Sequence, residues 1–462
     1  MTTPTLSEIA AGVHGYQPRA LPAEAVTAFL EQLVEPVTGT ESVGLFAALD
    51  RVLATDLVSP VSVPPHDNSA MDGYAFDGAQ LSRLPPGESQ LALRVVGTAL
   101  AGQTAPVRAG PGECVRIMTG AVMPPGLDTV VPQELARVDG GTVRIGAGLL
   151  RAGDHRRRAG EDLMQGRVAL ARGERLTPAA LGLVASLGLP SVTVFRRLRV
   201  ACFSTGDELL SPGDAPRAGA VYDSNRYALL GLLARLGAEP IDLGVVPDTP
   251  AQLEAALRRA ARQADAVITS GGVSEGDADH LRSTVQRLGD VAFWHVAMRP
   301  GRPMAVGRLR GDDSDGAESP MVESASSAIS SMGYSYQNNS KRFSADRLWF
   351  GLPGNPVAAM VAFLAFVRPA LLRAMGCTRP APPMLRATAT EALNKKPGRT
   401  EYQRGIVSTA PDGALQVRTT GHQGSGVLSS MVQANGLIVL PHSRGPVAAG
   451  DAVDVMMFDG AL

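Results

Sequence analysis

The feature that most constrains the fold is an alternation of short apolar runs and helical segments between residues 191 and 376. The runs "LRVACFS" (198–204), "IDLGVV" (241–246) and "ADAVITS" (264–270) are predicted strands, and each is followed by a segment with helical spacing. Such alternation is typical of a parallel sheet whose strands are joined by crossover helices. We therefore predict a Rossmann-like α/β domain, which "RLWFGL" (347–352) and a long apolar helix complete.

The rest of the chain predicts further domains. Its 462 residues exceed one compact domain, and about 150 residues per domain gives roughly two to four units. Residues 21–55 predict a helix and a connector. From Val58 to about residue 144, short β-like runs alternate with Pro/Gly-rich turns, which predicts a compact β-rich domain. Beyond about residue 380 the runs are again β-like, and we expect a small terminal barrel or sandwich.

The composition excludes several classes of function. A net charge of -1 gives no argument for nucleic acid or an acidic membrane as a partner. No run of 18 apolar residues predicts a membrane span, and the N-terminal segment lacks the pattern of a secretory signal. Cys114, Cys202 and Cys377 lie far apart and form no CxxC pair, so neither a disulfide framework nor a zinc site is expected. A cytoplasmic protein is the default prediction.

Acidic side chains follow three predicted strands, at the edge where ligands bind in an open parallel sheet. They are Asp207, Glu208, Asp248, Glu275, Asp277 and Asp279. Any one of these acids alone is better explained as a helix cap or a favourable charge in a first helical turn. Agreement at three strand ends favours a shared site.

The loop after the third strand combines two kinds of chemistry. Gly271 and Gly272 leave it open enough to wrap an anion, yet its carboxylates should repel one. A hard divalent cation reconciles the two, because Mg²⁺ prefers oxygen ligands and is usually held by one or two carboxylates plus substrate phosphates. No His/Cys cluster offers a softer metal site.

Basic and turn-forming residues come next in the chain. Arg299 and Arg302 lie on a Pro-Gly turn with His295 nearby, and "GLPGNPVAA" (351–359) places a second turn before a long helix. Such a turn can present backbone N–H groups at the helix N-terminus, and arginine suits the recognition of tetrahedral oxyanions. Alone the second turn could be only a rigid connection. Opposite an arginine pair it is a candidate oxyanion site.

One segment fits no predicted element. Residues 311–346 are Ser-rich and weakly apolar, and they lie between two predicted strands. This composition favours a disordered surface insertion in a hairpin over a binding element. Its length makes it able to shield or crowd the neighbouring 351–356 loop.

Nine stretches, in order over nearly the whole chain, resemble one family closely. They are "PPHDNSAMDGYAF" (64–76), "IMTGAVMPPGLDTVV" (117–131), "RRAGEDL" (157–163), "FSTGDEL" (203–209), "YDSNRYAL" (222–229), "TSGGVSEGDADH" (269–280), "RPGRP" (299–303), "GLPGNPVAA" (351–359) and "GHQGSGVLSSM" (421–431). The chain resembles the molybdopterin molybdenumtransferases of molybdenum-cofactor biosynthesis, the bacterial MoeA type, seen also in the E domain of gephyrin. "TSGG" alone would be a weak signal, because smaller molybdopterin-binding proteins and the competence-damage-protein family share that domain.

The resemblance implies a Mg²⁺-dependent transferase. In the family, adenylylated molybdopterin and molybdate bind together, AMP is released, and molybdenum is inserted into the dithiolene to form the molybdenum cofactor. The resemblance also implies an elongated homodimer whose site lies between the sheet domain of one subunit and the β-rich domain of the other. Other proteins of cofactor biosynthesis are further candidate partners, whereas nucleic acid and membranes are not.

Placed on this chain, the family pattern predicts a multidomain α/β protein. Its parts are an N-terminal linker and dimerisation domain of residues 17–57 plus 145–190, an inserted β-rich domain of 58–144, a molybdopterin-binding α/β domain of 191–376 with the disordered-type insertion 311–346, and a C-terminal β domain of 377–462.

The resemblance also implies roles for particular residues. Positions that match family residues needed for activity are Asp72, Thr119, Asp162, Glu208, Asp248, Asp279, Pro353 and Pro356. The predicted ligands of Mg²⁺ come from Glu208, Asp248, Asp277 and Asp279. The predicted substrate-binding residues are Ser270, Gly271, Gly272 and Ser274 for the phosphate, Arg299, Arg302, Pro353, Gly354, Asn355 and Pro356 for molybdate, and Arg404, Ser425 and Ser429 from the terminal domain.

Some of these roles have plainer explanations. Without the resemblance, Asp72 would be a turn residue beside Gly73, and Thr119 a strand-end hydroxyl that bonds its own backbone. The chain also departs from the family, because Arg299 and Arg302 stand where many members carry lysine, and this changes the geometry available for molybdate. His295 occupies a position that is often lysine, so its charge at neutral pH is open.

Two alternative functions remain open. The first is another enzyme on the same sheet domain, such as a molybdopterin adenylyltransferase, although those enzymes lack the "NSAMDGYAF" domain and the terminal β domain. The second is a gephyrin-like scaffold that binds a partner peptide, although this chain retains every acid and "GLPGNP". The sequence does not distinguish molybdate from tungstate as the preferred oxyanion, nor does it show which carboxylates bind Mg²⁺ directly.

Overall fold

The computed structural model describes residues 5–16, 20–83, 88–103, 107–273, 280–311 and 346–458. Within them the chain forms two compact units. The first comprises Met1–Glu41, Asp50–Val52 and Phe195–Leu462, and the second comprises Ser42–Leu49 and Leu53–Val194. Ser274, Asp277 and Asp279 lie outside the described residues, as does all but the two ends of the predicted insertion 311–346.

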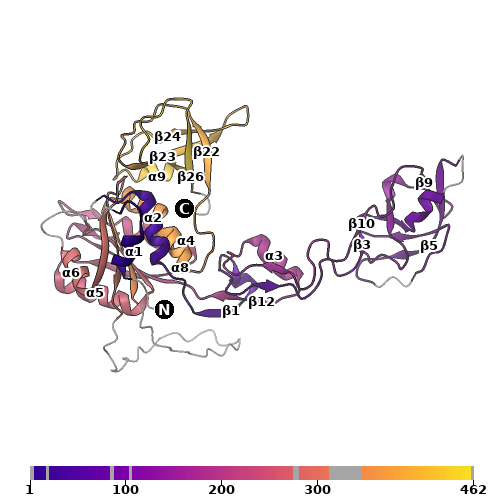
Figure 1. The fold of residues 1–462 in the computed structure, drawn as a ribbon, viewed down its shortest axis with the longest axis horizontal. Helices are drawn as coiled ribbons and strands as arrows, with labels where there is room; N and C mark the ends of the chain where they lie inside the picture. Colours follow the sequence, from indigo (N-terminus) through magenta and orange to yellow (C-terminus); the bar gives the residue numbers. More distant parts are fainter. Residues whose placement is uncertain are drawn as a thin grey trace, which may run out of the picture. The chain divides into compact units, whose positions relative to one another are not determined.

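A six-stranded sheet forms the centre of the first unit (Figure 1). In spatial order its strands are β16 (Glu239–Val246), β13 (Arg199–Thr205), β17 (Ala266–Ser270), β21 (Arg347–Leu352), β20 (Pro303–Leu309) and β18 (Gly289–His295). The first four of these run parallel, and β20 and β18 each pair antiparallel with the strand before them. The predicted parallel-rich α/β sheet is therefore confirmed.

The order of the strands creates a crevice at one edge of this sheet. The chain leaves β13 for β16 through α4 (Asn225–Leu236) and returns past β13 to β17 through α5 (Pro250–Gln263). Because parallel crossovers are right-handed, the two helices lie on opposite faces of the sheet. The carboxyl ends of β13 and β17 then flank a topological switch point, which is where open α/β sheets bind their ligands.

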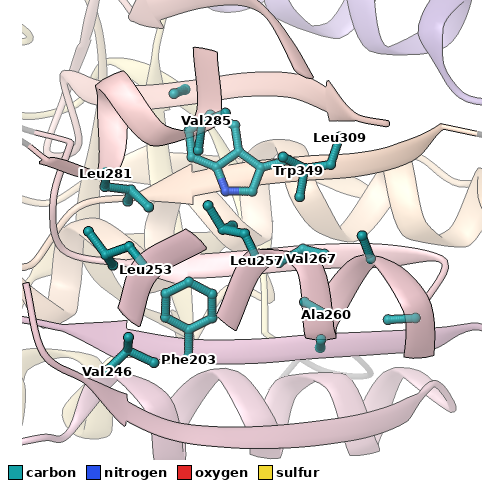
Figure 2. Close-up of a cluster of buried hydrophobic side chains, with 14 of the residues drawn as sticks. Phe203, Val246, Leu253, Leu257, Ala260, Val267, Leu281, Val285, Leu309 and Trp349 are labelled. Atoms are coloured by element: carbon teal, nitrogen blue, oxygen red, sulfur yellow. The ribbon is translucent and has the colours of Figure 1, made fainter. Parts of the chain in front are cut away.

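A buried apolar cluster joins one face of the sheet to α5 and α6 (His280–Leu288). It includes Phe203 of β13, Leu253 and Leu257 of α5, Leu281 of α6, and Trp349 of β21 (Figure 2). Complete burial of a side chain of this size contributes about 1.5–3 kcal/mol. The cluster therefore holds the strands in register and fixes the positions of the loops that leave their carboxyl ends.

A long apolar helical run packs against α4. It consists of α7 (Pro356–Ala362), a π-helical segment (Phe363–Val367) and α8 (Arg368–Ala374). The π-helical segment ends two residues before Pro369, whose ring would otherwise clash with the backbone one turn earlier. Among the described residues, Pro356–Ala374 is the one helix long and apolar enough to cross a membrane, but its apolar window is 83% buried inside the protein. It is therefore a core helix.

A β-barrel ends the first unit. Its strands β23 (Thr400–Thr409), β24 (Leu415–Thr419), β22 (Met384–Ala389), β26 (Ala452–Met457) and β25 (Gly436–Leu440) pair in this order. A further pairing of β25 with β23 closes the barrel, so of the two predicted forms the barrel is confirmed. β19 (Met298–Arg299) pairs with β23 and thereby joins the predicted arginine turn to the barrel. The remaining elements of this unit are α1 (Leu6–Gly12), α2 (Ala23–Leu33), β14 (Leu209–Leu210), β15 (Val221–Tyr222) and α9 (Ser429–Gln433).

The second unit contains another six-stranded sheet. In spatial order its strands are β7 (Thr129–Pro132), β4 (Gly73–Phe76), β6 (Glu113–Ile117), β5 (Gln90–Ala99), β9 (Thr142–Gly146) and β8 (Arg137–Asp139). Successive residues of a strand point to opposite faces, so Cys114 and Val115 of β6 enter different apolar clusters. This sheet agrees with the β-rich pattern predicted from Val58 onward.

Shorter elements accompany that sheet. A separate apolar cluster forms where α3 (Pro178–Ser186) packs, and it includes Leu57, Leu176 and Val184. The short strand pairs are β1 (Thr40–Gly44) with β12 (Ser191–Phe195), β2 (Leu57–Val58) with β11 (Val168–Leu170), and β3 (Asn68–Ser69) with β10 (Arg156–Arg157). The 3₁₀ turns are Leu45–Ala48, Gly78–Arg83 and Gln133–Leu135.

A partly buried ion pair ties the start of the sheet together. Both terminal nitrogens of Arg196 donate to the carboxylate of Asp265 at 2.7 Å, and the backbone N–H of Arg199 donates to it at 2.8 Å. Burial raises the pKa of Asp265, but these hydrogen bonds outweigh burial and hold its pKa below the ordinary value. The ionised carboxylate is therefore the form that stabilises the fold.

We expect Asp265→Ala to lower the free energy of unfolding of this domain by about 1.5–3 kcal/mol, because it removes a charged acceptor of hydrogen bonds from Arg196 and from the Arg199 N–H. Since the folded pKa is depressed, the contribution is full above the unfolded pKa of about 3.9 and is lost as the pH falls through the folded pKa. Urea unfolding followed by tryptophan fluorescence reports on this domain, because both tryptophans, at positions 294 and 349, belong to its strands. Asp454→Ala, which breaks an exposed pair with Arg386 in the barrel, should cost less than about 1 kcal/mol. Equal effects of the two variants at pH 7 would contradict this interpretation.

Candidate active site

A large cavity opens at the switch point of the α/β sheet. Its volume is about 1380 Å³, which exceeds what a drug-sized ligand needs. The loops after β13, β17 and β21 line it, together with the arginine turn and residues 423–426 of the barrel. The cavity lies entirely within the first unit, and most of the predicted substrate-binding residues of that unit surround it.

The glycine loop after β17 forms one wall. Gly271 and Gly272 have φ angles of 91° and 64°, a conformation that favours glycine. A Cβ atom on Gly271 would lie 2.3 Å from the carbonyl oxygen of Thr205, the last residue of β13. The backbones on the two sides of the switch point therefore approach so closely that only glycine fits at position 271.

Carboxylates gather beside this loop, as predicted. Asp248 and Glu208 both line the cavity, and the backbone N–H of Asp248 donates to Asp207 at 3.3 Å. Burial raises the pKa of Asp248; His280 lowers it, and the charges of Asp207 and Glu208 raise it further. Among the described residues, the buried Oδ1 atom of Asp248 has no hydrogen-bond partner. An unpartnered carboxylate oxygen among other acids is suited to a hard cation.

The described part of the chain does not by itself complete a metal site. Within those residues, no group of three or more His, Cys, Asp or Glu side chains is arranged to hold a metal ion. Two of the predicted ligands, Asp277 and Asp279, lie outside the described residues, as does the predicted phosphate-binding residue Ser274. Of the predicted metal ligands, the structure thus brings together Glu208 and Asp248.

Arginines also line the cavity. Arg299 and Arg302 line the cavity, and both side chains are exposed. The turn that carries them is closed by a hydrogen bond from the N–H of Val296 to the carbonyl of Arg302 at 2.9 Å. The pairing of Met298 with Thr400 anchors it to the barrel. Among the described residues, neither arginine forms an ion pair. The turn therefore leaves both positive charges available at the edge of the cavity.

The Pro353–Pro356 turn lies on the cavity wall and leads into α7, as predicted. One backbone donor of that helix is already used, because the N–H of Val357 donates to the carbonyl of Ser425 at 3.1 Å. This bond brings the barrel loop onto the helix N-terminus. The turn thus offers fewer free N–H groups to an oxyanion than the sequence led us to expect.

The predicted barrel residues occupy three different positions. Ser425 lines the cavity, whereas Ser429 begins α9 outside it. Arg404 has only 1% of its surface exposed and donates to Ser430 and to the carbonyl of Gly424, each at 3.0 Å. Burial, together with the smaller effect of the positive charge of Arg299, lowers the pKa of Arg404 to about 10. Two cations held this close favour an anion near them.

Asn225 is a site residue that our sequence reasoning did not assign. It lines the cavity at the start of α4, within the "YDSNRYAL" stretch. Its side-chain amide donates at 2.8 Å to both Ser270 and the carbonyl of Gly354. The Asp-Ser-Asn sequence before a helix was the available signal, but it predicts only a helix start.

The predicted residues of the second unit form a separate group. Asp72 accepts hydrogen bonds from both the hydroxyl and the backbone N–H of Thr119 at 2.7 Å. These bonds lower the pKa of Asp72, and the positive charge of Arg116 adds to the effect. Asp162 is exposed and donates its N–H to the carbonyl of Val63 at 3.1 Å. The structure therefore joins Asp72 to Thr119 and presents an ionised carboxylate on the surface.

Comparison with known proteins gives matches over almost the whole chain. Three family models match: "MoeA N-terminal region (domain I and II)" over residues 21–188, "Probable molybdopterin binding domain" over 201–373, and "MoeA C-terminal region (domain IV)" over 386–458. The molybdopterin molybdenumtransferase of Haemophilus influenzae is 39% identical over 95% of this chain and 98% of its own length. Molybdopterin molybdenumtransferase 2 of Mycobacterium tuberculosis is 36% identical over 94% of this chain and 97% of its own length.

A solved structure agrees with these sequence matches. The molybdopterin biosynthesis MoeA protein of Pyrococcus horikosii has a TM-score of 0.68 and 28% identity, and the alignment covers 95% of this chain and 99% of that one. Sequence and fold thus match the same family from end to end. The chain belongs to the MoeA family of molybdopterin molybdenumtransferases.

Proposed function

We infer that the protein is a molybdopterin molybdenumtransferase, which inserts molybdenum from molybdate into adenylylated molybdopterin and releases AMP. The observation that carries this conclusion is the single cavity whose walls combine a glycine loop, carboxylates and an arginine turn. Such a cavity can hold a pyrophosphate-linked nucleotide and a tetrahedral oxyanion side by side. Family membership over the full length supplies the identity of both substrates.

We propose Mg²⁺ as the metal of this site. The unpartnered Oδ1 of Asp248 and the neighbouring carboxylate of Glu208 fit a hard cation, and Asp277 and Asp279 are the further candidate ligands. When bound, Mg²⁺ would offset the charge that develops on the pyrophosphate oxygens during cleavage.

The residues of the chain supply mainly position and charge. The open backbone at Gly271 and Gly272 admits the phosphate of the pterin close to the sheet edge. Arg299 and Arg302 hold molybdate from the arginine turn, and Arg404 adds positive charge from the barrel. Holding two anions in reacting distance converts a bimolecular step into a unimolecular one, and this proximity is worth several orders of magnitude in rate.

We further propose that the enzyme acts in the cytoplasm as a homodimer, with Asp72 of the partner subunit closing each site. The hydrogen bonds from Thr119 keep that carboxylate ionised on an exposed surface, which suits a role toward a group outside its own unit. Other proteins of cofactor biosynthesis would deliver the substrate or accept the product.

Asp72→Ala is expected to abolish activity while the dimer persists. Subunit complementation separates a composite site from a single-chain site. Asp72→Ala mixed with Asp248→Asn should regain about a quarter of wild-type activity, because a random mixture makes half of the dimers mixed and each mixed dimer holds one intact site of two. No recovery after confirmed subunit exchange would contradict a site shared between subunits, and loss of the dimer in Asp72→Ala would make the role of Asp72 structural.

The proposed function is tested with purified protein, adenylylated molybdopterin, molybdate and Mg²⁺. AMP release should require the metal, so that EDTA stops it and added Mg²⁺ restores it. A second arm with molybdopterin and ATP tests the adenylyltransferase alternative. Absence of AMP release in the first arm would overturn the proposed function, and product in the second arm would favour the alternative.

A further inference from the structure

The side chain of Asn225 bridges two loops that form different parts of the cavity. Its Nδ2 donates at 2.8 Å to Ser270 Oγ, at the carboxyl end of β17 where the glycine loop begins, and at 2.8 Å to the carbonyl of Gly354, in the turn after β21. A longer bond of 3.4 Å reaches the carbonyl of Pro353. Only 7% of the residue is exposed, yet it lines the cavity. One amide group thus connects the glycine loop to the oxyanion turn.

The orientation of this amide is fixed by chemistry. The carbonyls of Pro353 and Gly354 only accept hydrogen bonds, so the NH₂ group of Asn225 must face them. Ser270 Oγ lies 3.3 Å from the carbonyl of Pro353 and completes a triangle with the amide. Because an aspartate at this position would direct a carboxylate at two carbonyl oxygens, the link requires a donor.

The base of Asn225 is held rigidly. Asp223, which is buried, accepts hydrogen bonds at 3.1 Å from Ser204 Oγ in β13 and from the backbone N–H and the Nε of Arg226. Arg226 also pairs with Asp242 of β16. These bonds fix the start of α4 to two strands of the sheet. When either loop moves, the helix cannot follow it, and the movement therefore strains the hydrogen bonds of Asn225.

We propose that Asn225 is a positioning residue that couples the phosphate subsite at residues 270–272 to the oxyanion subsite at the Pro353–Pro356 turn. This inference rests on the proposed function and concerns how the two loops of its site order each other. An anion that settles in one subsite orders its loop, and the shared amide then orders the other loop before the second anion arrives. Each ligand therefore tightens the binding of the other, and the two effects are equal by linkage.

The coupling is measured by calorimetric titration of AMP into the protein, with Mg²⁺ present and with or without saturating molybdate. In the wild type we expect molybdate to lower the Kd of AMP by about fivefold or more, within the usual range of coupling between sites. Asn225→Asp should bring this ratio close to unity, whatever the new charge does to the Kd of AMP alone. Asn225→Ser, a smaller neutral variant, should also lose most of the coupling if its melting temperature stays near that of the wild type.

Asn435→Asp is the matched control. The amide of Asn435 also donates to a backbone carbonyl, that of Val407 at 2.9 Å, but this bond lies within the barrel away from the cavity. That variant should keep the coupling of the wild type. The proposal is overturned if the wild type shows no coupling, or if Asn225→Asp weakens AMP and molybdate binding separately but leaves the coupling ratio intact. Failure of the proposed function is a different result, namely no AMP release by the wild type whatever the coupling.

Discussion

Asp248→Asn is expected to slow AMP release by on the order of 100-fold at saturating Mg²⁺. The substitution keeps the shape of the side chain but removes its charge from the group of carboxylates formed with Asp207 and Glu208. A loss of about 3 kcal/mol of transition-state stabilisation, a modest share of what a metal ion supplies, corresponds to that change in rate. The apparent Kd for Mg²⁺ should rise in parallel.

Asp290→Asn provides the control for this prediction. Asp290 is an exposed aspartate in β18 of the same sheet, and it does not line the cavity. Its replacement should leave both the rate and the Mg²⁺ dependence unchanged. If Asp248→Asn released AMP within about threefold of the wild-type rate, Asp248 would hold no essential metal, since a single lost ligand charge costs more than that.

Gly271→Ala is expected to have a comparable effect, for a steric reason. The new methyl group would lie 2.3 Å from the carbonyl oxygen of Thr205, and a φ of 91° is itself unfavourable for alanine by about 1–3 kcal/mol. The loop must move away from β13, and a displaced phosphate cradle should lower kcat/KM by roughly 100-fold or more. The melting temperature should fall by several degrees.

Gly244→Ala separates the clash from the backbone strain. Gly244 lies in β16 of the same sheet and has a φ of 78°. A Cβ atom at this position would meet nothing within 4 Å. Its replacement should lower the melting temperature by a similar or smaller amount and leave kcat/KM within about twofold. If Gly271→Ala behaved like Gly244→Ala in the activity assay, the glycine loop would not position the substrate.

The main sheet and the location of the cavity could be predicted because they depend on local patterns. Apolar runs such as 198–204 must be buried, and helical spacing between them leaves few topologies other than a parallel sheet. Once the strands were placed, the acids at their ends had to meet at one edge. The structure brings Glu208 and Asp248 to the same cavity, and in the second unit it brings Asp72 to Thr119.

Other parts of the site depend on contacts that no local pattern contains. Asn225 and Gly354 are separated by more than a hundred residues, and only the folded sheet brings them within hydrogen-bond distance. The same is true of Val357 and Ser425. Their hydrogen bond uses a backbone N–H at the helix N-terminus that we had expected to be available to an oxyanion. Arg404 belongs to β23, and its burial against Gly424 also follows from strand closure rather than from its neighbours in sequence.

We expect this site to release adenylate from the pterin and to insert molybdenum into the pterin in one coupled reaction. The most direct measurement quantifies AMP and molybdenum-bound pterin in the same reaction, the latter by its ability to reconstitute a molybdenum-free apo-enzyme. We expect equimolar amounts of the two products from the wild type, and formation of both products about 100-fold more slowly by Asp248→Asn. AMP released without any reconstituting cofactor, or cofactor formed without AMP, would contradict the claim.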